Sequence, residues 1–309
     1  MKVLITGAGG LLGAHLIALL SRRQEVTGTD RHPWWGDRPV NLAHGELSDA
    51  PFVEQLIKET RPDCLIHCAA ITNVDLCERD PAMAYAMNAE VTARLAKAVS
   101  PSCLFVYIST DGLFQGNKSM VTEEEPPQPR TVYGKSKEQG EREVQLSGKR
   151  HLIIRTNFYG WSSGRKKTFV EWLYESLRTG SPITLFDDFF FTPIYVADLA
   201  ENLVNLIEGG HQGVFHLVGR ERLSKCDFGK MLAEEAGFST HSVTVGSLDQ
   251  AHLTAPRPKD MSLDGNRFSR ETGRMLPDAR SGLVRFLRDH GRSLSQRFEK
   301  EVLAGPTKP

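Results

Sequence analysis

The chain has 309 residues, of which 40% are hydrophobic and 25% are charged, and its 38 basic and 38 acidic side chains give a formal net charge of zero. This composition is that of an ordinary folded protein and excludes general disorder, and the length predicts one large domain or two lobes. The balanced charge argues against a general affinity for nucleic acid or an anionic membrane, because both require a basic excess.

Short apolar runs alternate with helical patterns in the first half of the chain. Fully apolar strands that alternate with amphipathic helices are typical of a parallel sheet covered on both faces. The pattern therefore predicts an α/β fold, a doubly wound parallel sheet of the Rossmann type, over residues 1–156. Strands are expected at 3–6, 25–29, 64–70 and 103–109, and helices at 11–20, 52–59 and 81–99.

The alternation loosens in the second half. We expect residues 157–309 to form mainly a smaller, discontinuous C-terminal substrate-binding lobe, with parts of 190–220 returning to the first domain. A segment at 186–191 combines two carboxylates with aromatic residues, and it either packs as a loop or contacts a substrate. Helices are expected at 132–146, 168–178, 196–207, 225–236 and 281–303, and strands at 151–156 and 214–218.

The cysteines and the apolar segments bear on the compartment. Five cysteines are an odd number, and none form a Cys-x-x-Cys pair, so buried reduced thiols are expected rather than a disulfide framework or a zinc site. No apolar stretch reaches about 18 residues, so no transmembrane helix is expected. Glycines interrupt the N-terminal apolar run, which argues against a signal peptide. We expect a cytoplasmic protein without a metal site.

A glycine-rich turn follows the first expected strand. Gly7 would permit the tight turn, Gly10 the close approach of a pyrophosphate, and Gly13 close packing of the helix, whose N-terminus favours an anion. Asp30, at the end of the second strand, completes a dinucleotide-binding pattern. Its carboxylate favours NAD over NADP because it repels a 2′-phosphate, although Arg31 can offset that repulsion. The motif predicts NAD(H) or NADP(H) as cofactor.

A tyrosine and a lysine lie one helical turn apart. Tyr133 and Lys137 share a helix face, and a nearby ammonium would lower the tyrosine pKa from about 10. The motif Ser109-Thr110-Asp111 ends the fourth expected strand, at the edge where open α/β sheets bind ligands. A hydroxyl there is placed to hold the oxygen of a reacting carbonyl or alcohol. These residues predict proton transfer to or from such an oxygen.

The glycine turn, the Ser-Thr-Asp strand end and the Tyr-x-x-x-Lys helix resemble the extended short-chain dehydrogenase/reductase superfamily, also called NAD-dependent epimerase/dehydratases. Further segments resemble the dTDP-4-dehydrorhamnose reductase type of sugar-nucleotide reductase and cover almost the whole chain in the same order. The resemblance implies an NAD(P)-dependent oxidoreductase that reduces a keto group on a nucleotide-linked sugar in carbohydrate biosynthesis. The segments are 68–75, 84–89, 108–116, 124–127 and 255–258.

The resemblance also implies roles for single residues. Thr110 would bond the substrate oxygen, Tyr133 would exchange the proton, and Lys137 would bind the nicotinamide ribose. Arg257 is a candidate for the diphosphate of the substrate, because guanidinium pairs well with phosphate oxygens. The other implied site residues are Asp111 and Asn157 for the substrate, and Gly7, Gly10, Leu11, Leu12, Asp30, Arg31, Glu46, Leu47, Cys68, Ala69, Ala70, Thr72, Tyr133 and Lys137 for the cofactor.

The sequence is also compatible with other functions. Gly112 follows Asp111 where related 4,6-dehydratases usually have glutamate, so dehydration is disfavoured. A sugar-nucleotide epimerase would use the same site. An NAD(P)-binding regulatory subunit that resembles the β subunit of methionine adenosyltransferase is a third function. The sugar, the nucleotide and the oligomeric state stay open, with a homodimer among the options.

Overall fold

A seven-stranded parallel sheet organises the larger part of the computed structural model, which describes residues 1–164, 167–251 and 254–299. The strand order is β11-β6-β5-β4-β1-β2-β3, so the order reverses between β1 and β4, and such a reversal is where open α/β sheets bind ligands. All six strand pairs are parallel. The strands are β1 (Lys2–Thr6), β2 (Glu25–Asp30), β3 (Asn41–His44), β4 (Cys64–His67), β5 (Leu104–Ile108), β6 (His151–Arg155) and β11 (Gly213–His216).

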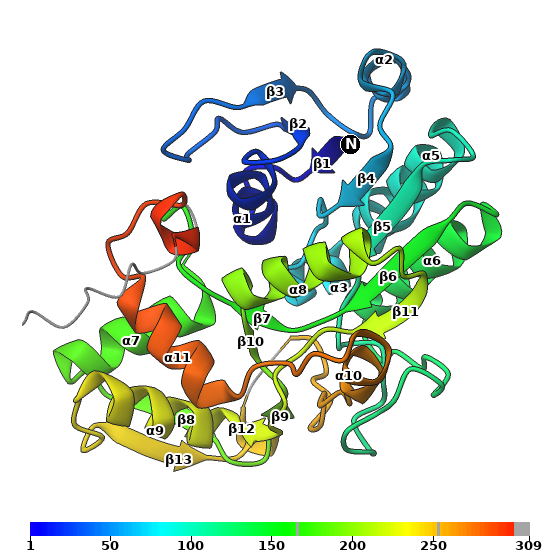
Figure 1. Cartoon of the computed structure of the whole chain (residues 1–309). Coiled ribbons are helices and arrows are strands. Elements are labelled where there is room, and N and C mark those ends of the chain that lie inside the picture. The colour runs from blue at the N-terminus through cyan, green and yellow to red at the C-terminus, as the bar shows by residue number, and fades with distance from the viewer. Residues whose placement is uncertain (165–166, 252–253, 300–309) are drawn as a thin grey trace, which may run out of the picture.

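Helices cover both faces of this sheet (Figure 1). Alternate residues of β1 enter opposite cores: Val3 and Ile5 pack with α1 and α8, whereas Leu4 packs with α2, α5 and α6. Both faces are therefore buried, which explains why the strand sequences are almost wholly apolar. The predicted doubly wound parallel sheet is confirmed. The helices are α1 (Leu11–Leu20) and α8 (Val196–Glu208) on one face, and α2 (Ala50–Thr60), α5 (Val91–Ala98) and α6 (Val132–Leu146) on the other.

The second half of the chain adds short strand pairs and further helices beside the carboxyl ends of the main strands (Figure 1). β11 leaves this region and joins the edge of the main sheet next to β6. The division into two lobes near residue 157 stays a prediction. The added elements are β7 (Phe158–Tyr159), β8 (Ile183–Phe186), β9 (Phe190–Phe191), β10 (Ile194–Tyr195), β12 (Leu223–Ser224), β13 (Val243–Gly246), α7 (Phe169–Thr179), α9 (Lys225–Ala236), α10 (Asn266–Thr272) and α11 (Ala279–Arg288).

Four elements differ from their predictions. The strand β3 was missed because its sequence is short and polar, so the expected fourth strand is β5. The expected helix over 81–99 comprises α4 (Pro81–Tyr85), a π-helical turn over Ala86–Glu90, and α5. The predicted tail helix over 281–303 is confirmed only as far as Arg288, where α11 ends and buried Asp289 accepts a hydrogen bond from Tyr195. Residues 300–303 lie outside the described part. A short helix that was not expected, α3 (Val74–Arg79), follows β4.

The cysteines are all unpaired thiols, four of them buried and Cys68 partly exposed. Among residues 1–164, 167–251 and 254–299, no helix combines the length and the apolar character that crossing a membrane requires.

Candidate active site

The turn between β1 and α1 is shaped by two glycines. Gly7 has a φ of +68°, a conformation that L side chains rarely adopt, and a Cβ there would lie 2.8 Å from the nitrogen of Ala69. A Cβ on Gly13 would lie only 2.2 Å from the carbonyl oxygen of Gly7. Helix α1 begins at Leu11, so the first-turn amides of Leu11 and Leu12 have no helical acceptor. This cradle fits the diphosphate of a dinucleotide.

Asp30 ties the end of β2 to the glycine turn. Its carboxylate accepts hydrogen bonds from the backbone amides of Gly9, at 2.9 Å, and His32, at 2.8 Å. The Trp35 indole donates to the carbonyl oxygen of Gly9 at 2.9 Å. Arg31 is exposed and has no hydrogen-bond or ion-pair partner within the described residues. The predicted pair, Asp30 and Arg31, therefore lies beside the turn, as contact with an adenosine ribose requires.

The segment after β4 forms the other side of this turn. The amides of Cys68 and Ala69 donate to the backbone oxygen and the hydroxyl of Thr6, at 3.2 and 3.3 Å. Cys68, Ala69 and Ala70 are partly exposed, and Thr72 is exposed. The structure thus brings two of the four predicted floor residues, Cys68 and Ala69, close to the glycine turn, and the cofactor contacts of Ala70 and Thr72 stay predictions.

The predicted adenine pair follows β3. Glu46 is exposed, whereas the Leu47 side chain is buried in the core beside α2 and α5. The carbonyl oxygen of Leu47 accepts a hydrogen bond from the Arg94 guanidinium at 3.1 Å. Contact of this pair with adenine stays a prediction.

The structure brings the three predicted catalytic residues together. Thr131 caps α6 by accepting a hydrogen bond from the Gly134 amide, and this fixes the start of the helix that carries Tyr133 and Lys137. The Tyr133 hydroxyl lies close to the Thr110 side chain, which stands just beyond the carboxyl end of β5. The geometry suits proton exchange with a ligand oxygen held between these hydroxyls.

The electrostatics of Tyr133 differ from the expectation. Burial raises the pKa of Tyr133 above its ordinary value, and the nearby Thr110 side chain opposes this rise. The expected lowering by Lys137 is not found, because its ammonium donates to the Ile108 carbonyl oxygen at 2.8 Å and lies 4.0 Å from the centre of the Tyr107 ring. Burial in turn lowers the pKa of Lys137 to about 7.

Asp111 and Asn157, both predicted substrate residues, meet beside Thr110. The buried Asp111 carboxylate accepts hydrogen bonds from the Thr110 hydroxyl, at 3.1 Å, and the Asn157 amide, at 2.5 Å. Burial raises the pKa of Asp111 to about 6, and the bond from Asn157 opposes that rise. The cluster places a carboxylate next to the reacting centre.

Asn88 is a site residue that the sequence analysis missed. It lies in the π-helical turn, and its amide accepts from the Ile71 amide and donates to the Ile71 carbonyl oxygen and the Ser136 hydroxyl, at 2.9, 3.1 and 3.0 Å. These bonds fix the segment after β4 against α6, one residue before Lys137. A buried asparagine in an alanine-rich helix needs such partners, and π-helical turns often occur at functional sites.

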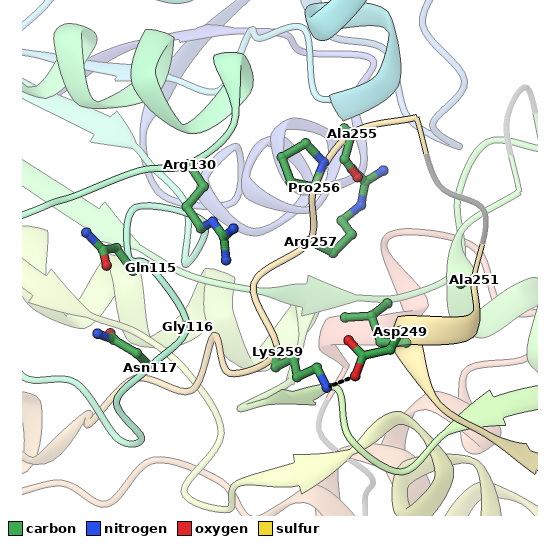
Figure 2. A pocket seen from close by; sticks show the side chains of 11 residues that line it. Gln115, Gly116, Asn117, Arg130, Asp249, Ala251, Ala255, Pro256, Arg257 and Lys259 are labelled. Atoms are coloured by element: carbon green, nitrogen blue, oxygen red, sulfur yellow. Dashed lines mark hydrogen bonds and ion pairs between the residues drawn. The ribbon is translucent and has the colours of Figure 1, made fainter.

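A cavity of about 460 Å³ is lined in part by residues that lie between Thr110 and Tyr133 in the sequence (Figure 2). Arg130, three residues before Tyr133, is exposed and unpaired within the described residues. The predicted Arg257 turns its guanidinium toward the Ala255 carbonyl oxygen and pairs with Asp75 at 3.0 Å. The lining residues are Gln115, Gly116, Asn117, Arg130, Leu248, Asp249, Ala251, Ala255, Pro256, Arg257 and Lys259.

Comparison with known proteins gives a consistent set of similarities. The family described as RmlD substrate binding domain matches residues 1–291. The dTDP-4-dehydrorhamnose reductase of Mycobacterium tuberculosis is 30% identical over 278 residues, covering 87% of this chain and 86% of that one. The crystal structure of the Bacillus anthracis dTDP-4-dehydrorhamnose reductase in complex with NADP matches with a TM-score of 0.83 and 30% identity, over 94% of this chain and 100% of that one. Methionine adenosyltransferase 2 subunit beta of Xenopus tropicalis is 28% identical, covering 87% of this chain and 82% of that one.

Proposed function

The chain belongs to the RmlD substrate-binding domain family, and from that premise we propose that it is an NAD(P)-dependent reductase of a keto group on a nucleotide-linked sugar. The observation that carries this proposal is the meeting of Thr110, Tyr133 and Lys137 beyond the carboxyl end of β5. The glycine turn fits the cofactor, because its shape leaves room for a diphosphate against the N-terminus of α1.

Tyr133 acts as the proton donor in this proposal. When bound, the nicotinamide cofactor supplies the hydride that reduces the keto carbon. Burial keeps the Tyr133 hydroxyl protonated, so it can donate to the substrate oxygen as negative charge develops there. The Thr110 hydroxyl, close to Tyr133, holds the same oxygen.

Lys137 positions the reacting groups. Its bond to the Ile108 carbonyl oxygen fixes the ammonium at the end of β5, and Lys137 follows Tyr133 by one turn of α6. From there it can donate to ribose hydroxyls of the nicotinamide half. A pKa of about 7 lets it exchange a proton at neutral pH.

The nucleotide end of the substrate is assigned to the cavity of Figure 2. Arg130 and Arg257 come from separate segments of the chain and supply guanidinium groups that suit a diphosphate. Asp111 and Asn157 then lie at the sugar end, beside Thr110.

The decisive experiment measures consumption of NADPH and NADH with a dTDP-4-keto-6-deoxy sugar. We expect turnover by the wild-type protein, no turnover by Tyr133→Phe, and unchanged cofactor binding by that variant. The matched control is Tyr174→Phe, which changes a tyrosine that packs against Trp161 and Phe238 in the second half of the chain. Wild-type protein that consumes no cofactor with any sugar nucleotide would refute the proposal.

The same assay separates the two other functions. An epimerase would convert the sugar without net consumption of reduced cofactor. A regulatory subunit is favoured by the similarity to methionine adenosyltransferase 2 subunit beta. It would show no turnover and would bind a methionine adenosyltransferase catalytic subunit in a fixed stoichiometry.

A further inference from the structure

Lys225 is a charged residue in unusual surroundings. It is the first residue of α9, and its ammonium lies over three phenylalanine rings, 3.3 Å from the centre of Phe191, 4.5 Å from Phe169 and 5.2 Å from Phe189. The side chain is partly exposed, yet the ammonium makes no hydrogen bond and no ion pair with any residue in the described part of the chain. No acceptor in the described part of the chain uses this ammonium, so it can donate a hydrogen bond to a ligand.

A neighbouring strand pair holds Lys225 in this place. β12 runs antiparallel to β9, with Ser224 opposite Phe190, and the Lys225 amide donates to the Phe189 carbonyl oxygen at 3.0 Å. Two segments more than thirty residues apart are thus locked together. The aromatic segment at 186–191 surrounds this ammonium through two of its phenylalanines.

The position is unfavourable for a cation. Desolvation opposes the charge, and the first turn of a helix carries partial positive charge. Burial lowers the pKa of Lys225 to about 7. Contact with aromatic faces offsets part of this cost, but a methionine would fill the same space without it. A charged side chain in such unfavourable surroundings is typical of a functional site.

Asp111 is the carboxylate whose charge opposes the lowering of the Lys225 pKa. Each charge favours the ionised form of the other group, although no ion pair joins the two side chains, both of which lie in the described residues. The Asp111 carboxylate already accepts from Thr110 and Asn157, and each of its oxygens keeps a further lone pair. A hydroxyl between the two groups would accept from the ammonium and donate to the carboxylate. An anionic substituent would instead be repelled by Asp111.

We propose that Lys225 is a substrate-binding residue that donates a hydrogen bond to a neutral sugar hydroxyl, which in turn donates to Asp111. This inference rests on the proposed function, because it places the sugar ring between Thr110 and the aromatic cage formed by Phe169, Phe189 and Phe191. Lys225 therefore contacts the sugar of the substrate rather than its nucleotide.

The test compares Lys225→Met with Lys230→Met, a matched change at an exposed lysine of the same helix. Both variants are assayed with NADPH and the dTDP-4-keto-6-deoxy sugar, and binding of dTDP alone and of NADPH is measured by calorimetry. For Lys225→Met we expect KM for the sugar nucleotide to rise about tenfold to a hundredfold, the loss of one charged hydrogen bond. Affinities for dTDP and NADPH should equal those of the wild type.

Lys225→Gln, which keeps a donor, should recover part of the lost affinity. An unchanged KM in Lys225→Met, or equal losses for the sugar nucleotide, dTDP and NADPH, would overturn the inference, because the first excludes contact and the second indicates a structural role. Wild-type protein without turnover would refute the proposed function as well. Turnover by the wild type with an unaffected Lys225→Met would refute this inference alone.

Discussion

The Lys137 ammonium donates a hydrogen bond to the Ile108 carbonyl oxygen at 2.8 Å, so the central helix of the site is anchored to the last residue of β5. Thr110 follows Ile108 by two residues, just beyond the end of the same strand. The proton donor, its hydroxyl partner and the lysine are therefore positioned by one strand and one helix. This rigidity comes at the cost of a buried cation, and that cost makes stability depend on pH.

Replacement of Lys137 by methionine should change this pH dependence. The folded-state pKa of about 7 lies below the ordinary lysine value, so the unfolded chain binds more protons than the folded one between pH 7 and about 10. The free energy of unfolding should rise across this window, by up to about 1.4 kcal/mol per pH unit from this group. Lys137→Met should lack that rise in urea titrations.

The matched control is Lys135→Met, on the exposed side of α6. It should keep the wild-type pH slope. Equal slopes for Lys137→Met and the wild type would show that the lysine pKa is not lowered.

Arg31 should discriminate between the two cofactors. Its guanidinium is exposed and unpaired within the described residues, next to Asp30, where a 2′-phosphate would lie. Arg31→Ala should weaken NADPH binding about tenfold and leave NADH binding unchanged, because only NADPH carries the additional phosphate. Arg23→Ala, at the exposed end of α1, is the control for a general loss of positive charge. Equal weakening of both cofactors would contradict this role.

Gly13→Ala should damage the cofactor turn. The new methyl group would lie 2.2 Å from the Gly7 carbonyl oxygen, and backbone cannot yield as a flexible side chain can. We expect loss of NADPH binding and a lower Tm. Gly112→Ala is the comparison, since its nearest neighbour, the Thr110 hydroxyl oxygen, would be at an ordinary 3.5 Å. Tight NADPH binding by Gly13→Ala would show that the turn tolerates displacement.

The fold could be predicted because its signals are local. Fully apolar strands, a glycine turn and a Tyr-x-x-x-Lys helix are visible in short windows, and the family resemblance that they suggested is confirmed. The strand β3 was missed because its edge position allows polar residues.

The missed site residues depend on tertiary contacts. Asn88 acquires its role from partners 17 and 48 residues away in the chain. Lys225 lies beside Phe189 and Phe191 because β12 pairs with β9, and beside Phe169 at the start of α7. Asn88 lies in a segment that resembles the family, 84–89, but the sequence of that segment does not show its partners, and Lys225 lies in no such segment.

The buried pair between Arg155 in β6 and Glu141 in α6 should stabilise the helix of the site. The side chains are each 4% exposed and lie 2.8 Å apart. Arg155→Met would leave the Glu141 carboxylate buried without a partner, so we expect a loss of about 3–5 kcal/mol in the free energy of unfolding. The double variant Arg155→Met/Glu141→Leu should recover most of this loss, because both charges are removed. Arg142→Met, which breaks an exposed pair on the same helix, should cost about 1 kcal/mol or less. A double variant as unstable as Arg155→Met would show that packing of the arginine stem, rather than the pairing of charges, holds α6 against the sheet.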